Sequence, residues 1–141
     1  MLFKRNEMKK LRAEMCRLAE QIAHGFGVKL DYSDGSVKDV ERILSEVHDE
    51  YCRTGKEDGL RGVALEFAAY LVSVVERHHG SVDWKRDHET IGKDSFPLHW
   101  NATTLFPYGW CLKRIFDGPG GDIVSKWQVC VLDRSRGPAA R

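Results

Sequence analysis

Apolar positions are densest in residues 60–78, where they cover nearly the whole circumference of a helix. Leucine, valine, alanine and phenylalanine form the widest face, and Ala69, Tyr70 and Val72 fill most of the rest. A helix that is apolar on all sides is normally enclosed by its own domain. The pattern therefore predicts a central buried helix with a compact single domain around it. Glu66 interrupts the run and is expected at its one solvated edge, with Tyr70 four residues on as a hydrogen-bond partner.

Two amphipathic helices are predicted before this segment. The first spans about residues 4–24 and ends at Gly25 and Gly27. Its apolar residues recur at alternating spacings of three and four, which places them on one stripe. This stripe consists of Met8, Leu11, Met15, Leu18 and Ile22. The second helix begins after Ser36, the predicted N-cap, and pairs an apolar face with a solvated face that includes Glu41.

After Gly80 the hydrophobic period changes from that of a helix to that of a strand. In residues 82–86 and again in 96–101, large apolar side chains alternate with polar ones. Alternation of this kind predicts two strands with one wet face, joined here by a long loop. Residues 103–106 are expected to add a third short strand, which completes a small antiparallel sheet.

The last third of the chain returns to helical patterns. Pro107 suits the first position of a helix, and the glycines of residues 118–121 end it. Asp122 is predicted to cap a final helix; residues 127–131 fit a strand as well, but we favour the helix. Helices, then a sheet, then helices indicate an α+β fold, with N-terminal helices, a central buried helix, a small antiparallel sheet and two C-terminal helices.

One set of spaced residues follows a pattern seen elsewhere. It consists of Tyr70-Leu71, Val74, Arg77, Gly80 and Trp84, followed by Phe106-Pro107, Lys113-Arg114-Ile115 and Gly118. With Leu30-Asp31-Tyr32-Ser33 upstream, this set resembles a group of small bacterial proteins of unknown function, over residues 28–133. Members of that group often carry Gly-Glu where this chain has Val72-Ser73, a departure that removes one candidate catalytic carboxylate. The resemblance implies a fold and no activity.

The length of 141 residues fits one domain. We divide the chain into an N-terminal amphipathic helical arm (1–27), a single α+β domain (28–133) and a basic flexible tail (134–141). The formal charge of +1 gives no global field to steer nucleic acid or a membrane surface. The sequence has neither the apolar core of a signal peptide nor about 18 uncharged apolar residues in a row. We therefore expect a cytoplasmic protein with no membrane partner.

The four cysteines, Cys16, Cys52, Cys111 and Cys130, are far apart and form no C-x-x-C pair. Neither a zinc knuckle nor a redox pair is indicated, and buried reduced thiols are expected. Cys111 lies in the first turns of a predicted helix, where a dipole could acidify a thiol. Its apolar neighbour Trp110 favours a packing role instead.

No cluster of residues matches a recognisable reaction, so candidate sites rest on proximity. Four candidate ligands occur within a short stretch of sequence at the expected junction of helix and sheet: His79, Asp83, His88 and His99. A metal-dependent or small-molecule hydrolase site could form there. The chain lacks H-E-x-x-H spacing, however, and neighbouring histidines on a helix point in different directions. We therefore expect no metal and no cofactor, and keep the hydrolase as the alternative.

Two surfaces could instead bind a partner. A groove for a ligand or peptide could be lined by Trp84, Trp100, Tyr108 and Trp110. Aromatic residues at this density more often form a core. The stripe of the first helix could contact another protein or a second copy of the chain. The basic residues of that helix alternate with glutamates, which disfavours nucleic acid. We therefore predict a non-catalytic protein-protein interaction module, a class that includes self-associating and immunity-like proteins.

Overall fold

The computed structural model describes residues 5–135, so most of the predicted tail, from residue 136 on, lies outside the described residues. Its main helices are α1 (Arg5–Gly25), α2 (Val37–Thr54), α3 (Leu60–His79), α4 (Pro107–Asp117) and α5 (Ile123–Trp127). Three short strands are β1 (Asp83–Trp84), β2 (Leu98–Trp100) and β3 (Thr103–Leu105). The shorter helical turns are η1 (Asp34–Ser36), η2 (Pro119–Gly121), the π-helical η3 (Gln128–Leu132) and α6 (Asp133–Ser135). The predicted α+β fold class is confirmed.

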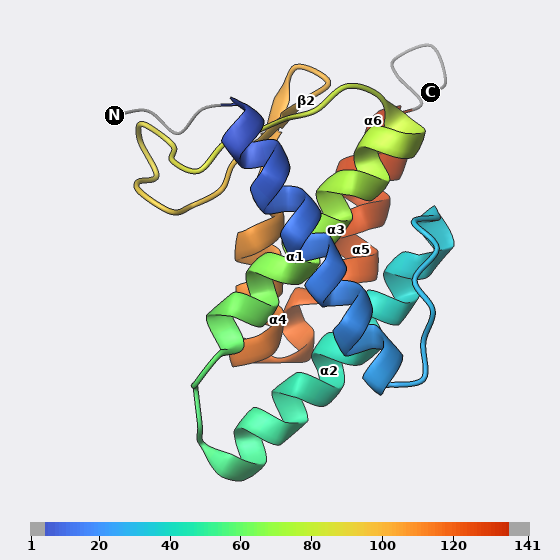
Figure 1. Cartoon of the computed structure of the whole chain (residues 1–141), viewed down its shortest axis with the longest axis vertical. Coiled ribbons are helices and arrows are strands. Elements are labelled where there is room, and N and C mark those ends of the chain that lie inside the picture. Colours follow the sequence, from blue (N-terminus) through green and yellow to red (C-terminus); the bar gives the residue numbers. More distant parts are fainter. Residues whose placement is uncertain (1–4, 136–141) are drawn as a thin grey trace.

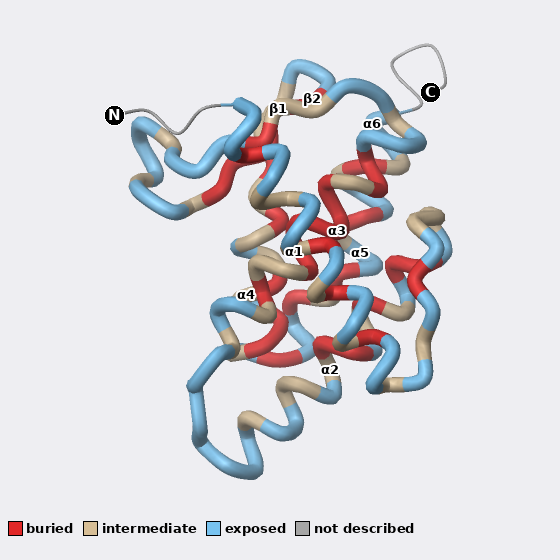
Figure 2. The backbone as a smooth tube through the Cα atoms, viewed as in Figure 1, coloured by how far each residue is buried: buried red, intermediate tan, exposed pale blue. Residues whose placement is uncertain are grey.

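Helix α3 occupies the centre of the molecule. In Figure 1, α1 crosses in front of α3 and α4 and α5 lie behind it, and Figure 2 shows the buried backbone concentrated along this helix and its neighbours. Every residue from Phe67 to Val72 has an exposed fraction of 0%. Burial of the large side chains among them, such as Phe67, Leu71 and Val72, contributes roughly 1.5–3 kcal/mol each, so this segment is a substantial source of the hydrophobic stabilisation. The prediction of a central buried helix is confirmed.

Helix α1 packs mainly on α3. The face turned toward the core carries Met8, Cys16, Ala19 and Ala23, all buried, and its small residues let the two helices approach closely. The predicted apolar stripe of α1 is only partly on this face. Met8 is buried in the contact, Leu11, Met15 and Ile22 are half-buried at its edge, and Leu18 is half-buried as well.

The start of α2 differs from the sequence prediction. Ser36 is the last residue of η1, and its side chain makes no cap hydrogen bond with α2. Its hydroxyl instead donates to the carbonyl oxygen of Ser33 at 2.6 Å, while its backbone N–H donates to Ser33 Oγ at 3.1 Å. Ser36 already has helical dihedrals, with φ −69° and ψ −13°, so its side chain does not point toward the free N–H groups of α2 as a capping residue does. Ser36 therefore occupies the N-cap position of α2, as predicted, but its side chain does not make the capping hydrogen bond.

The three strands form an antiparallel sheet in the order β1-β2-β3. Two cross-strand rows define its faces. Trp84, Leu98 and Leu105 are paired across the strands and face the core, and the row Asp83, His99 and Thr104 is the half-buried outer face. Residues 101 and 102, both at positive φ (52° and 59°), make the two-residue turn that joins β2 to β3.

The strands are shorter than the alternation predicts. Arg86 was expected in a strand but is exposed in the loop that follows β1. The pairing ends because Phe96 has a φ of +49°, a left-handed conformation that breaks the extended course of its strand. Two backbone bonds, from Lys85 N to the Pro97 oxygen and from Phe96 N to the Arg86 oxygen, hold the base of the loop in place of a regular ladder.

The C-terminal predictions agree with the structure. Pro107 is the first residue of α4, and Gly118 ends that helix with a φ of +94°. The carboxylate of Asp122 accepts hydrogen bonds from the backbone N–H groups of Val124 (2.7 Å) and Ser125 (3.2 Å), so it caps α5 as expected. Residues 127–131 are helical, passing from the end of α5 into η3.

A buried ion pair fastens α2 to α4. Arg114 Nε donates to Glu41 Oε2 at 2.8 Å, and the backbone N–H of Ile123 donates to Glu41 Oε1 at 3.0 Å. The side chains of Arg114 and Glu41 are only 5% and 19% exposed. Glu41 was expected on the solvated face of its helix, so this expectation is wrong.

Within residues 5–135, no helix combines the length and the apolar character needed to cross a membrane.

Candidate functional site

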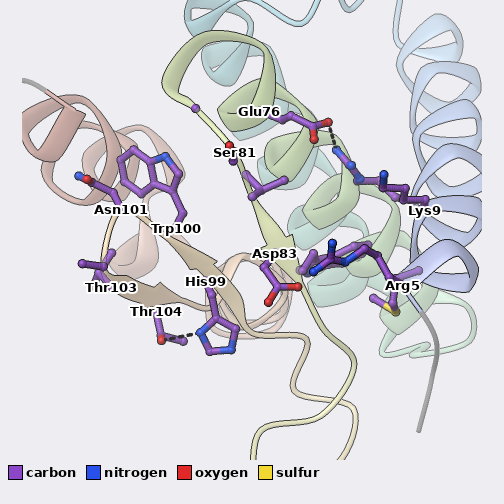
Figure 3. Close-up of a pocket in the computed structure, with 16 residues that line it drawn as sticks. Arg5, Lys9, Glu76, Ser81, Asp83, His99, Trp100, Asn101, Thr103 and Thr104 are labelled. Atoms are coloured by element: carbon purple, nitrogen blue, oxygen red, sulfur yellow. Dashed lines mark hydrogen bonds and ion pairs between the residues drawn. The ribbon is translucent and has the colours of Figure 1, made fainter.

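A groove of about 850 Å³ separates the first half of α1 from the sheet. One wall comes from α1 and the end of α3, and the other from residues 80–84 and 99–104. Figure 3 shows β1 on the side of the sheet nearest α1, with Arg5 and Asp83 directed toward each other across the opening. The site therefore gathers residues from three distant parts of the sequence.

The α1 wall is basic. Arg5, Lys9 and Arg12 follow one another at spacings of four and three residues, which places them on the same side of the helix. Arg12 is held in place by Glu76, with Arg12 Nη1 donating to Glu76 Oε1 at 2.8 Å, and this bond lowers the pKa of the Glu76 carboxyl. Arg5 and Lys9 form no salt bridge with any residue in the described part of the chain. Two cations therefore remain for a ligand.

The sheet wall is polar. Its row of Asp83, His99 and Thr104 belongs to the outer face of the sheet, and His99 Nδ1 lies 3.0 Å from Thr104 Oγ1. Asn101 is fixed by a hydrogen bond from its side-chain amide to the carbonyl oxygen of Arg134, at 3.2 Å. These side chains supply hydrogen-bonding groups in fixed positions opposite the two unpaired cations.

The two tryptophans that line this groove belong mostly to the core. Trp84 is 6% exposed and Trp100 is 4% exposed. Their ring N–H groups are used inside the protein, because Trp84 donates to the Phe96 oxygen at 3.2 Å and Trp100 donates to the His79 oxygen at 3.0 Å. They form a rigid floor and offer little area for stacking.

Tyr108 and Trp110, the other two residues of the predicted aromatic groove, lie on α4 and do not line this groove. Both are half-buried, and the ring of Tyr108 packs against Phe96 with centroids 5.2 Å apart. The four aromatic side chains therefore do not make one surface. This arrangement matches the alternative noted from the sequence, in which aromatic residues fill the space between sheet and helices.

The four predicted metal or hydrolase residues do not form one cluster. Asp83 and His99 are cross-strand neighbours in the groove, whereas His79 and His88 make other contacts. His79 Nε2 lies 2.8 and 3.0 Å from the carboxylate oxygens of Asp34, and this carboxylate also accepts from the ring N–H of Trp127 at 2.8 Å. His88 Nδ1 accepts from two backbone N–H groups of its own turn, at 3.1 and 3.0 Å. His99 bonds Thr104, and Asp83 lies across the groove from Arg5. Among residues 5–135, no three His, Cys, Asp or Glu side chains are grouped so as to hold a metal ion.

Asp34 is a structural residue that the sequence analysis missed. It joins η1 to the end of α3 through His79 and to α5 through Trp127. Nothing in the local pattern indicated this role, because Asp34 lies in a turn rich in residues that usually bond their own backbone.

The hydroxyl of Tyr70 does not bond Glu66 as predicted. It accepts from the backbone N–H of Tyr32 at 2.8 Å and lies 2.7 Å from Ser36 Oγ. Glu66 is half-buried, and its burial raises the pKa of its carboxyl.

All four cysteines are free. Cys16 and Cys111 are buried as predicted, and burial raises the pKa of both thiols, which makes Cys111 a poor nucleophile. Cys130 is half-buried. Cys52 is exposed, so the prediction of a buried thiol is wrong at that position.

No protein-family model matches the sequence, and comparison with curated proteins and with solved structures finds no significant match either.

Proposed function

We propose that this protein is a non-catalytic interaction module that holds an extended, acidic segment of a partner protein in the groove between α1 and the sheet. The observation that carries the proposal is the pair of unpaired cations, Arg5 and Lys9, facing a polar wall of fixed side chains across about 850 Å³. That volume falls within the range of roughly 300–1,000 Å³ typical of ligand clefts.

The strand order supports an extended occupant. β1 pairs only with β2, so its other edge is the one nearest α1. A free strand edge offers backbone N–H and C=O groups, and extended peptides commonly bind such edges by adding a strand. Residues 80–84, which include β1, line the groove along their length.

The charges support an acidic occupant. Arg12 forms a salt bridge with Glu76, whereas Arg5 and Lys9 form none among the described residues; Lys9 lies close enough to Glu76 to help lower the pKa of its carboxyl. Asp83 opposes them from the strand side. A bound segment would therefore place its carboxylates toward α1 and its neutral polar groups toward β1, which fixes its orientation as well as its charge.

A peptide-selection experiment tests this proposal. The full chain is panned against a phage-displayed library of random peptides, and the selected sequences are titrated by calorimetry. We expect peptides rich in Asp and Glu, whose affinity falls about tenfold in Arg5→Glu/Lys9→Glu, since each reversed charge costs on the order of 0.7 kcal/mol at a solvated site. Lys10→Glu/Lys29→Glu makes the same charge change at two exposed positions outside the groove and should leave affinity nearly unchanged.

Two results would contradict the proposal. One is the selection of peptides with no excess of acidic residues. The other is an equal loss of affinity in Arg5→Glu/Lys9→Glu and in Lys10→Glu/Lys29→Glu, because a general effect of net charge would then explain the binding.

The partner in this proposal is another protein or a second copy of the chain. Self-association through the half-buried stripe of α1 is tested by light scattering, comparing the full chain with Leu18→Lys. A cytoplasmic location is part of the proposal, supported by the four free thiols. The hydrolase alternative has less support, because His79, Asp83 and His88 bond different partners.

A further inference from the structure

The end of α2 carries a thiol and an imidazole in contact. Cys52 follows His48 by four residues, so the two side chains lie on the same face of the helix. Cys52 Sγ is 3.4 Å from His48 Nε2. Cys52 is exposed and His48 is half-buried, so a reagent in solution can reach the sulfur.

The imidazole is oriented by a third group. His48 Nδ1 lies 2.7 Å from the backbone carbonyl oxygen of Ile115, a buried residue of α4. A carbonyl oxygen only accepts, so Nδ1 carries the hydrogen. In the neutral ring, Nε2 then holds the lone pair, and this nitrogen is the one that faces Cys52. The result is a nucleophile next to a base whose tautomer is set by a second hydrogen bond.

The fold leaves little freedom to this ring. A Cβ atom placed on Gly118 would lie 2.9 Å from His48 Nε2, so the ring rests against a backbone that only glycine leaves open. Gly118 also has a φ of +94°, a conformation that side chains rarely adopt. Both the end of α4 and the glycine after it therefore position the base.

The other thiols lack this combination. Cys16 and Cys111 are buried, and Cys130 is half-buried. For these three, no hydrogen bond to an imidazole nitrogen is formed within residues 5–135. Cys52 is thus the one thiol of the four that is both exposed and next to a base.

We propose that Cys52 is a covalent modification site that takes low-molecular-weight disulfides, with His48 as its general base. His48 Nε2 accepts the proton of the thiol, and the thiolate attacks one sulfur of the disulfide. The disulfide bond breaks as the bond to Cys52 forms, and the departing thiolate takes a proton from the imidazolium. One disulfide is exchanged for another, so no external oxidant is needed.

The test uses the full chain and oxidised glutathione, followed by intact-mass measurement and peptide mapping. We expect one glutathionyl group on Cys52, and none at this rate on Cys52→Ser. His48→Gln keeps an N–H donor but removes the base, and the rate should fall at least about tenfold at pH 7. His24→Gln, an exposed histidine of α1, is the matched control and should react as the parent does.

A second measurement covers the case in which His48→Gln does not fold. Alkylation of Cys52 by iodoacetamide is compared in the native chain and in the same chain unfolded in urea, at one pH. Since the base is positioned only by the fold, the native rate should exceed the unfolded rate. If His48 serves only to bond the Ile115 carbonyl, native Cys52 reacts no faster than unfolded Cys52, and His48→Gln reacts as fast as the parent; either result overturns the proposal.

Discussion

Replacement of Glu41 by alanine is expected to be strongly destabilising, although a glutamate on a helix surface is normally replaceable. The substitution removes the partner of Arg114, whose side chain is 5% exposed, and the acceptor for the backbone N–H of Ile123. Arg114 is already incompletely bonded, because its Nη1 is buried without a hydrogen-bond partner in the described part of the chain. In Glu41→Ala the guanidinium would carry an uncompensated buried charge.

The size of the effect follows from this burial. Removing one member of a buried ion pair costs about 3–5 kcal/mol. Glu41 is 19% exposed, so water can enter where the carboxylate was, and the lower end, about 3 kcal/mol, is the better value. Domains of this kind have free energies of unfolding of about 5–15 kcal/mol, so the loss is a substantial fraction of the total.

Urea denaturation followed by circular dichroism measures this change. With a urea slope of about 2 kcal/mol/M, the midpoint should fall by about 1.5 M. Glu46→Ala is the control on the same helix, because Glu46 is 49% exposed and lies 3.9 Å from Arg42, and its loss should be below about 0.5 kcal/mol. The double variant Glu41→Leu/Arg114→Met should recover the part of the loss that comes from the uncompensated charge, because it removes both charges together, while the N–H of Ile123 stays without its acceptor. Equal midpoints for Glu41→Ala and Glu46→Ala would refute the reasoning.

Three further changes are expected to have measurable outcomes. Tyr70→Phe removes the hydroxyl that accepts from Tyr32 N, and should lower the free energy of unfolding by about 1–3 kcal/mol in urea; a loss below 0.5 kcal/mol would show that water replaces the hydroxyl. Glu66→Gln should stabilise the protein more at pH 7 than at pH 4 in thermal melts. Burial raises the pKa of Glu66, so the folded state is penalised only while the carboxyl is charged, and equal shifts at both pH values would contradict this cause. Asp122→Ala should cost about 1 kcal/mol through loss of the α5 cap, whereas Asp122→Ser, which can still accept from the same N–H groups, should keep most of the stability; equal losses would argue against capping.

The sequence predicts those elements whose signals are local. The span of α3 follows from one apolar pattern that only Glu66 interrupts. Pro107 and Asp122 mark helix starts by chemistry that involves only their own neighbours. Strand lengths are less predictable. The alternation in residues 82–86 continues past the point where pairing stops. Pairing stops at the left-handed conformation of Phe96, in the segment that leads into β2, and the pattern of residues 82–86 does not indicate that conformation.

The contacts that join the helices depend on residues far apart in the chain. Glu41 and Arg114 are 73 positions apart, and each is consistent with a solvated helix face when its own segment is considered alone. The groove is also built from segments far apart in the sequence, because its walls come from the start of α1 and from the sheet. By contrast, the spacing of His48 and Cys52 on one helix is a local signal, and the sequence alone could have indicated it. What it could not supply is the carbonyl of Ile115 that orients the ring.

Helix α1 packs mainly on α3, and its first turns also form one wall of the groove. The stability of these turns is therefore expected to change when the groove is occupied. An occupant that touches both walls would bridge α1 and the sheet directly, and so add a contact that the empty protein lacks. The amide hydrogens of residues 5–12 should then exchange with solvent more slowly in the complex than in the free chain. In the proposed complex, opening of this end of α1 would remove one wall of the groove, so the occupant would dissociate more readily when these first turns open.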